Sequence, residues 1–126
     1  MRFLPVFLEA SAGVFVLVGS GDAAVAKLRL LRAAGAHVRW FPRSADVAEE
    51  VLTQSGGGRL EISLGDPLSA DLSDAAAIVS AAGPVVDAQL AERARRERLP
   101  INVVDRPELS TFIWRLTGDQ THAWRK

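Results

Sequence analysis

The sequence predicts a three-layer α/β domain built around a parallel sheet. Short apolar runs rich in valine and other hydrophobic residues, typical of strands buried on both faces, recur along the chain. Segments with apolar residues at helical spacing lie between them. Strands that alternate with helices favour a parallel sheet joined by right-handed crossovers, and the strand order 3-2-1-4-5 is the natural expectation.

Five segments are predicted as strands, namely residues 14–18, 37–41, 60–64, 76–81 and 101–104. The first is continuously apolar, and its β-branched valines suit a strand in the middle of a sheet. The third is short and alternates between polar and apolar residues, which is typical of a strand at the sheet edge.

Three helices are expected: one over residues 23–34, one that begins after Ser44 and one that begins at Pro84. Asp22 is the expected N-cap of the first helix, and Gly35 is expected to end it, because glycine commonly follows a helix C-terminus. Proline suits the first position of a helix, where its missing N–H would have no partner.

Composition excludes several classes of function. The chain has 126 residues, enough for one domain, and 48% of them are hydrophobic, so a core can be buried. The 15 basic and 15 acidic residues give no net charge, which argues against a nucleic-acid partner. There are no cysteines and only two histidines, so no metal site built from these residues is expected.

The N-terminal segment superficially resembles a secretory signal, but Pro5 and Glu9 interrupt its apolar run. No apolar run approaches the roughly 20 residues that a membrane-spanning helix needs. We therefore expect a cytoplasmic protein without a membrane partner.

The turn after the first predicted strand has the pattern of a dinucleotide-binding motif. It reads Gly19, Ser20, Gly21, Asp22, Ala23 and Ala24. The first glycine permits a tight turn, the second lets the backbone approach a pyrophosphate, and the small Ala24 allows close helix–strand packing. The helix that follows would offer its N–H groups to the phosphates. This context predicts a Rossmann-like fold, although a plain turn of small residues is the alternative.

The end of the second predicted strand lacks the acidic residue that usually binds the ribose hydroxyls of NAD. Arg43 and Ser44 stand there instead. They are expected to contact the adenosine side of the cofactor, and Arg43 would also suit the 2′-phosphate of NADP; the alternative is that the cofactor has been lost. The sequence leaves the choice between NAD and NADP open.

Asp105 follows the last predicted strand and is expected at the lip of the ligand crevice, partly desolvated. A carboxyl group in such a place is a candidate general acid or base. The alternative is a turn-forming residue ahead of Pro107.

Three segments together carry a resemblance to a known family. They are LPVFL at Leu4–Leu8, VLVGSGDAAVAK at Val16–Lys27, and NVVDRP at Asn102–Pro107. With their spacing, these segments resemble the N-terminal dehydrogenase and ferrochelatase module of siroheme synthase, the precorrin-2 dehydrogenase family. A generic Rossmann domain would not be expected to carry both the second and the third motif.

The resemblance implies NAD-dependent oxidation of precorrin-2, a tetrapyrrole, to sirohydrochlorin, and in bifunctional members ferrous iron insertion as well. The family's cofactor contacts match Asp22, Ala23, Arg43 and Ser44, and its catalytic aspartate matches Asp105. The alternative is a degenerate relative that holds a dinucleotide or a tetrapyrrole without turnover.

The resemblance also implies a division of the chain. Residues 1–110 would form the NAD-binding domain, and residues 111–126 would be a remnant of the family's dimerisation region. Phe112, Ile113 and Trp114 open that tail. We expect them to drive homodimer formation, unless the tail folds back over its own domain and leaves a monomer.

Overall fold

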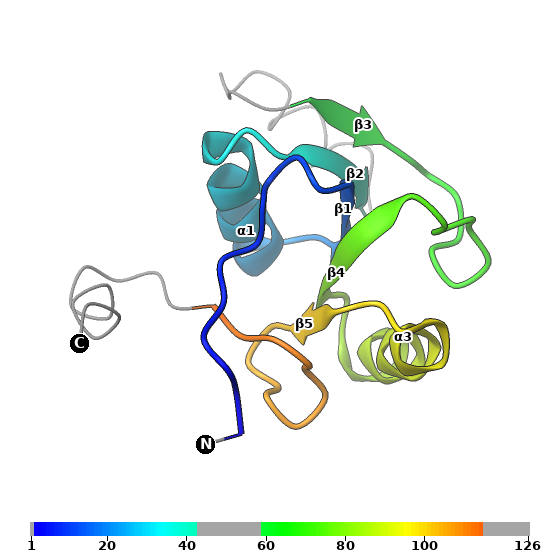
Figure 1. Cartoon of the computed structure of the whole chain (residues 1–126). Coiled ribbons are helices and arrows are strands. Elements are labelled where there is room, and N and C mark those ends of the chain that lie inside the picture. Colours follow the sequence, from blue (N-terminus) through cyan, green and yellow to red (C-terminus); the bar gives the residue numbers. More distant parts are fainter. Residues whose placement is uncertain (1, 43–58, 115–126) are drawn as a thin grey trace.

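A computed structural model describes residues 2–42 and 59–114 of the chain (Figure 1). These ranges contain β1 (Val14–Gly19), α1 (Asp22–Ala33), β2 (His37–Phe41), β3 (Leu60–Ile62), β4 (Ala75–Ala81), α3 (Pro84–Glu97) and β5 (Ile101–Val103). The expected helix after Ser44 lies outside the described residues.

The five strands form one sheet in the order β3-β2-β1-β4-β5, and all four neighbouring pairs are parallel. The predicted fold class and strand order are therefore confirmed. The chain leaves β1 towards β2 on one side and reaches β4 on the other, so the order reverses at the boundary between β1 and β4. In an open parallel sheet, ligands bind beyond the carboxyl ends of the strands at this switch point.

The helices cover opposite faces of the sheet, which gives the three layers (Figure 1). All six residues of β1 are buried. Val14, Val16 and Val18 belong to the core under α3, whereas Phe15 and Leu17 belong to the core under α1. This alternation is what a central strand with both faces covered requires, and it explains the unbroken apolar run in the sequence.

Several element boundaries differ from the prediction by one or two residues. The N-cap of α1 is Gly21, and Asp22 is already the first helical residue, so the predicted cap was wrong by one position. The physical reason is the backbone of Gly21, whose φ of 90° and ψ of −177° form a turn that is essentially restricted to glycine. The strands β3 and β5 end at Ile62 and Val103, earlier than expected.

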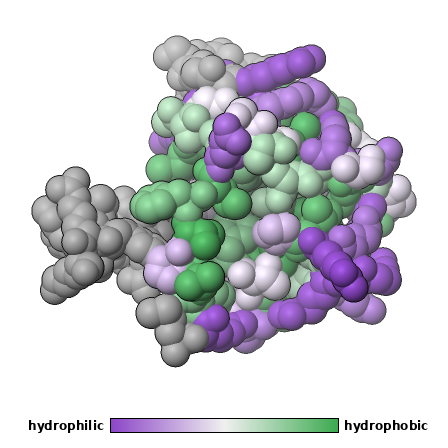
Figure 2. All heavy atoms as spheres, in the orientation of Figure 1, coloured by the Kyte–Doolittle hydropathy of each residue, from purple (hydrophilic) through white to green (hydrophobic). Residues whose placement is uncertain are grey.

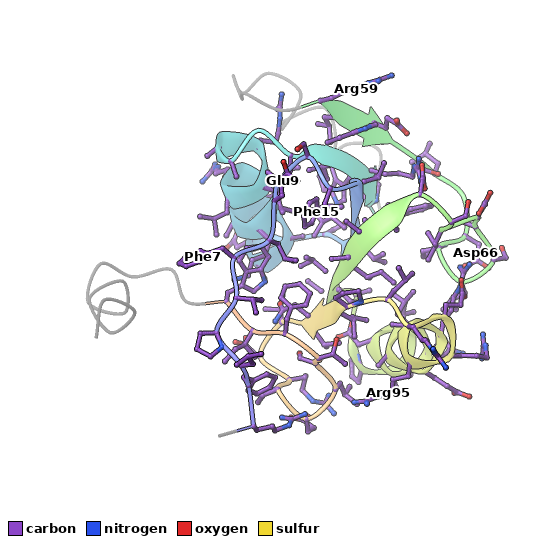
Figure 3. The ribbon with its side chains drawn as sticks, in the orientation of Figure 1. Phe7, Glu9, Phe15, Arg59, Asp66 and Arg95 are labelled. Carbon is purple, nitrogen blue, oxygen red and sulfur yellow. The ribbon has the colours of Figure 1, made fainter. Side chains whose placement is uncertain are left out.

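The N-terminal segment crosses the face of the molecule that is turned to the viewer in Figure 1, and hydrophobic surface gathers there in Figure 2. Its most exposed large apolar residues are Leu4, Val6, Phe7 and Leu8. Phe7 is 91% exposed and points outward in Figure 3. None of the helices in the described part of the chain is long and apolar enough to span a membrane.

Candidate functional site at the carboxyl edge of the sheet

Gly19 is the last residue of β1, and both its backbone and its surroundings require glycine. Its φ is +116°, and a Cβ atom added there would lie 2.1 Å from the carbonyl oxygen of Ala81 on β4. The Nε1 atom of Trp40, a fully buried residue of β2, donates a hydrogen bond of 2.8 Å to the Gly19 carbonyl oxygen. Gly19 therefore joins three strands at the switch point and fixes where the turn leaves the sheet.

Gly21 lies at the start of α1 and has open space above it. A Cβ atom added at Gly21 would meet nothing within 4 Å, although its φ of +90° would be strained for other residues. No side-chain hydrogen bond caps this helix start. The first N–H groups of a helix lack intrahelical partners and favour negative charge, so this turn has the features of an anion site.

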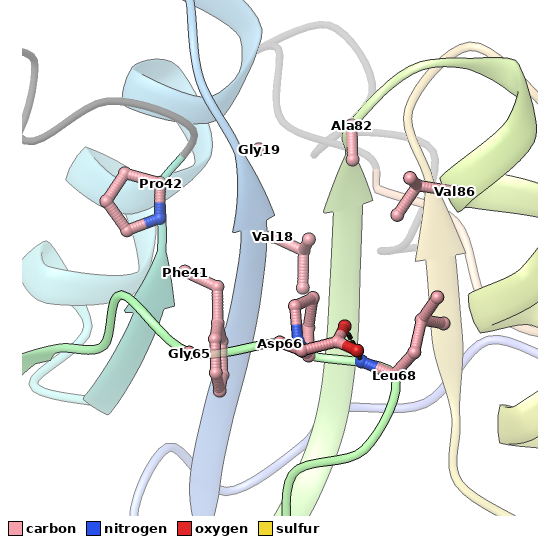
Figure 4. Close-up of a pocket in the computed structure, with 10 residues that line it drawn as sticks. Val18, Gly19, Phe41, Pro42, Gly65, Asp66, Leu68, Ala82 and Val86 are labelled. Atoms are coloured by element: carbon pink, nitrogen blue, oxygen red, sulfur yellow. Dashed lines mark hydrogen bonds between the residues drawn. The ribbon is translucent and has the colours of Figure 1, made fainter.

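A cavity of about 140 Å³ opens beside this turn, between the ends of β2 and β4 (Figure 4). We call it the Leu68 cavity. Its lining includes Phe41 and Pro42 at the end of β2, Leu68 in the loop after β3, and Ala82 and Val86 beyond β4. Most of the lining side chains are apolar, and Asp66 is the charged one among them, so the cavity suits a largely apolar group.

The loop that closes the Leu68 cavity is held in place by hydrogen bonds. The Oδ1 atom of Asp66 accepts a bond of 2.9 Å from the Leu68 N–H. Arg93 of α3 donates to the carbonyl oxygens of Pro67, at 2.9 Å, and of Ala70, at 2.5 Å. Asp66 lies in this loop on the opposite side of the molecule from the N-terminal segment (Figure 3).

Asp105 lies two residues beyond the end of β5, at the same edge of the sheet as the glycine turn. Its backbone has a left-handed φ of 61°, a conformation that aspartate tolerates better than most residues. The side chain is exposed, so the expected partial desolvation was wrong. The reason is that β5 ends at Val103 and the chain then turns outward, with the Arg106 N–H donating to the Val103 carbonyl oxygen.

A second cavity, of about 210 Å³, lies between α1 and the loop after β5. We call it the Lys27 cavity. Its lining includes Lys27, Asn102, Asp105, Arg106 and Trp114. Burial lowers the pKa of the Lys27 amine, and the negative charge of Asp105 partly raises it again. A half-buried cation and an exposed carboxylate thus face one cavity.

Among the sequence-predicted site residues, those from Gly19 to Ala23 form the turn at the switch point, and Asp105 lies at the same sheet edge. Arg43 and Ser44 lie outside the described residues. Sequence reasoning missed Lys27 and the loop around Leu68. For Lys27 the available signal was its place beside Leu28 in the buried stripe of α1. Within the described ranges, no three His, Asp or Glu side chains gather as a metal site would require.

Comparison with known proteins gives two findings. The chain is similar to the siroheme synthases of Nitrosospira multiformis (36% identical), Pseudomonas entomophila (34%) and Methylococcus capsulatus (36%). These matches cover 96%, 96% and 90% of this chain but 26%, 26% and 24% of the relatives. The chain therefore spans about a quarter of the length of the curated relatives it matches.

Residues 6–115 match the family described as "Putative NAD(P)-binding". That range takes in the whole sheet, the glycine turn and both cavities. The parallel sheet and the open turn at the start of α1 are the features expected of a dinucleotide-binding domain. The chain belongs to this NAD(P)-binding family.

Proposed function

We propose that this chain is a dehydrogenase module of siroheme biosynthesis, which oxidises precorrin-2 to sirohydrochlorin with NAD as the acceptor. One observation carries the proposal. The open turn at Gly21 and the carboxyl group of Asp105 lie at the same edge of the sheet. The similarity to siroheme synthases and the NAD(P)-binding family support the substrate and the cofactor class.

The pyrophosphate of the cofactor would lie on the Gly19–Ala23 turn, where the N-terminus of α1 favours negative charge. The apolar Leu68 cavity would receive the adenine ring. Arg43 and Ser44 are proposed as further contacts to the adenosine side. Bound NAD supplies a hydride acceptor.

Asp105 is proposed as the general base of the oxidation. Conversion of precorrin-2 to sirohydrochlorin removes one hydride and one proton from the macrocycle, so a positioned carboxylate that accepts the proton balances the reaction. Iron insertion, which the resemblance implies, also removes protons from the pyrrole nitrogens, and Asp105 would serve there in the same way. The exposure of Asp105 leaves it accessible to a large substrate.

Calorimetry and a turnover assay test the proposal together. NAD or NADH should bind to the purified chain, and NADP measured alongside decides between the two cofactors. Asp105→Ala should lower the rate of precorrin-2 oxidation by about 10²-fold or more, the usual contribution of a general acid or base. Glu108→Ala removes a carboxylate from the same loop and should change the rate little. Dinucleotide binding without any oxidation would favour the binding-module alternative.

We also propose that the chain forms a homodimer through its N-terminal segment. Phe112 and Trp114, expected in the interface, pack instead against the core under α1. The exposed apolar surface lies at Leu4, Val6, Phe7 and Leu8, where four large side chains form a surface that soluble monomers rarely expose.

Light scattering tests the dimer at high micromolar concentration. The unchanged chain should give the mass of a dimer, and Phe7→Ser with Leu4→Ser should give a monomer. Val85→Ser, a change at a side chain of α3 that is 71% exposed, is the matched control and should leave the dimer intact. A monomeric unchanged chain would contradict this proposal.

A further inference from the structure

Lys27 belongs to the buried side of α1 although it is charged. It follows the buried Ala24 by three residues and precedes the buried Leu31 by four, so helical geometry places all three on one stripe. Its ammonium group lies 4.9 Å from the centroid of the Trp114 ring. A cation at this distance from an indole ring is attracted by the negative face of the ring.

The ring of Trp114 is itself held in a fixed orientation. Its Nε1 atom donates a hydrogen bond of 2.9 Å to Oδ1 of Asn102. Asn102 is 5% exposed within β5, and its Nδ2 atom donates 3.1 Å to the carbonyl oxygen of Phe112. The indole ring that lies against the Lys27 ammonium is therefore anchored to the sheet.

Among the described residues, two cations line the Lys27 cavity, Lys27 and Arg106. Arg106 forms an ion pair with Glu108. Arg2, from the N-terminal segment, donates to the carbonyl oxygens of Pro107 and Ser110. Lys27 and Asp105 line the same cavity, and the negative charge of Asp105 partly offsets the lowering of the Lys27 pKa by burial.

We propose that Lys27 is a positioning residue for Asp105, because its ammonium, fixed over the Trp114 ring, is the counter-charge that holds the Asp105 carboxylate towards the cavity. The part of this inference that concerns catalysis rests on the proposed function. The pairing of the two charges across the cavity does not.

A lysine titration tests the pairing without any substrate. The chain has only two lysines, Lys27 and Lys126, so isotope-labelled lysine gives a spectrum with two side-chain signals. Asp105→Asn should shift the Lys27 pKa downward, because it removes the charge that raises it. Glu92→Gln, an exposed change on α3, is the matched control and should leave it unchanged. An unchanged Lys27 pKa in Asp105→Asn would overturn the proposal.

Kinetics test the positioning role. Lys27→Met should lower kcat for precorrin-2 oxidation by about tenfold or more, equivalent to ~1.4 kcal/mol in the barrier, and leave the affinity for NAD unchanged. Lys27→Arg keeps the charge and should retain most of kcat. If the loss in Lys27→Met came from packing alone, restoring a positive charge with arginine would not restore kcat. Full activity of Lys27→Met would overturn the positioning role of Lys27.

The two experiments separate the two failures. If the unchanged chain does not oxidise precorrin-2, the proposed function fails, while the titration still decides whether Lys27 pairs with Asp105. If the chain is active but Asp105→Asn does not move the Lys27 signal, the proposed function stands and this inference fails.

Discussion

In the described part of the chain, two helices begin at the carboxyl edge of the sheet, α1 after β1 and α3 after β4, and their N-cap residues have nearly the same backbone. The N-caps are Gly21, with φ 90° and ψ −177°, and Gly83, with φ 96° and ψ 164°. Neither helix start has a side-chain cap, and a Cβ atom added at either glycine would meet nothing within 4 Å. By backbone geometry alone, either start could face an anion.

The side chains of the first turn make the difference. In α3, Pro84 removes one N–H group and Asp87, 6% exposed, brings a carboxylate to the helix start. Its Oδ1 atom accepts bonds from the Ser80 hydroxyl at 2.5 Å and the Ala82 N–H at 2.9 Å. In α1 the first-turn carboxylate, Asp22, is exposed. The start of α3 thus holds its own buried anion, whereas the start of α1 is left open for one from a ligand.

The largest effect expected from this comparison is at Asp87. Asp87→Ala leaves the buried Ser80 hydroxyl and the Ala82 N–H without their acceptor, so the free energy of unfolding should fall by about 2–3 kcal/mol. Asp22→Asn changes an exposed carboxylate and should change the free energy of unfolding by no more than about 0.5 kcal/mol. Urea denaturation measures both. Equal losses in the two variants would remove the distinction between the helix starts.

A smaller effect is expected in a charge cluster away from both helix starts. Arg39 of β2 bonds to Glu61 at 3.2 Å and to Asp74 at 3.0 and 2.8 Å. Hydrogen bonds from Arg39 are the largest cause that lowers the pKa of both carboxyls. Their stabilisation is therefore complete above the ordinary pKa values, 4.5 and 3.8, and is lost as the pH falls through the lowered ones.

Because both carboxylates are at least one-third exposed, Arg39→Met should cost only about 1 kcal/mol or less at neutral pH. The difference from the unchanged chain should shrink when unfolding is repeated in acid below the ordinary pKa values. A cost that exceeds the cost of Asp87→Ala would show that the surface cluster, not the helix start, dominates polar stabilisation.

Much of the fold was predictable because its cause is local in the sequence. The apolar run of β1 and the glycine at its end specify a central strand and a tight turn, and Pro84 marks the start of α3 as predicted. The N-cap of α1 was misplaced because an aspartate after a glycine is a common cap, and only the backbone angles of Gly21 show that the helix has already begun.

The site was predictable only where one segment builds it. The glycine turn is a single segment, but the Lys27 cavity brings α1 together with residues about 80 positions later in the chain, a pairing that periodicity does not reveal. The burial of Asp105 was misjudged because β5 is one residue shorter than its apolar run. The loop around Leu68 has turn-forming residues, and only its anchor to Arg93 shows that it closes a cavity.

The most direct test of the account compares NAD affinity in Gly21→Ala and Gly83→Ala by calorimetry. Both changes place a Cβ in open space on a backbone that favours glycine, so each should cost a similar 1–3 kcal/mol or so of stability, roughly the strain of such a conformation. Only Gly21→Ala should weaken NAD binding, by about tenfold or more, equivalent to ~1.4 kcal/mol. Equal affinities in the two variants, or a larger loss in Gly83→Ala, would contradict the assignment of the phosphate site to α1.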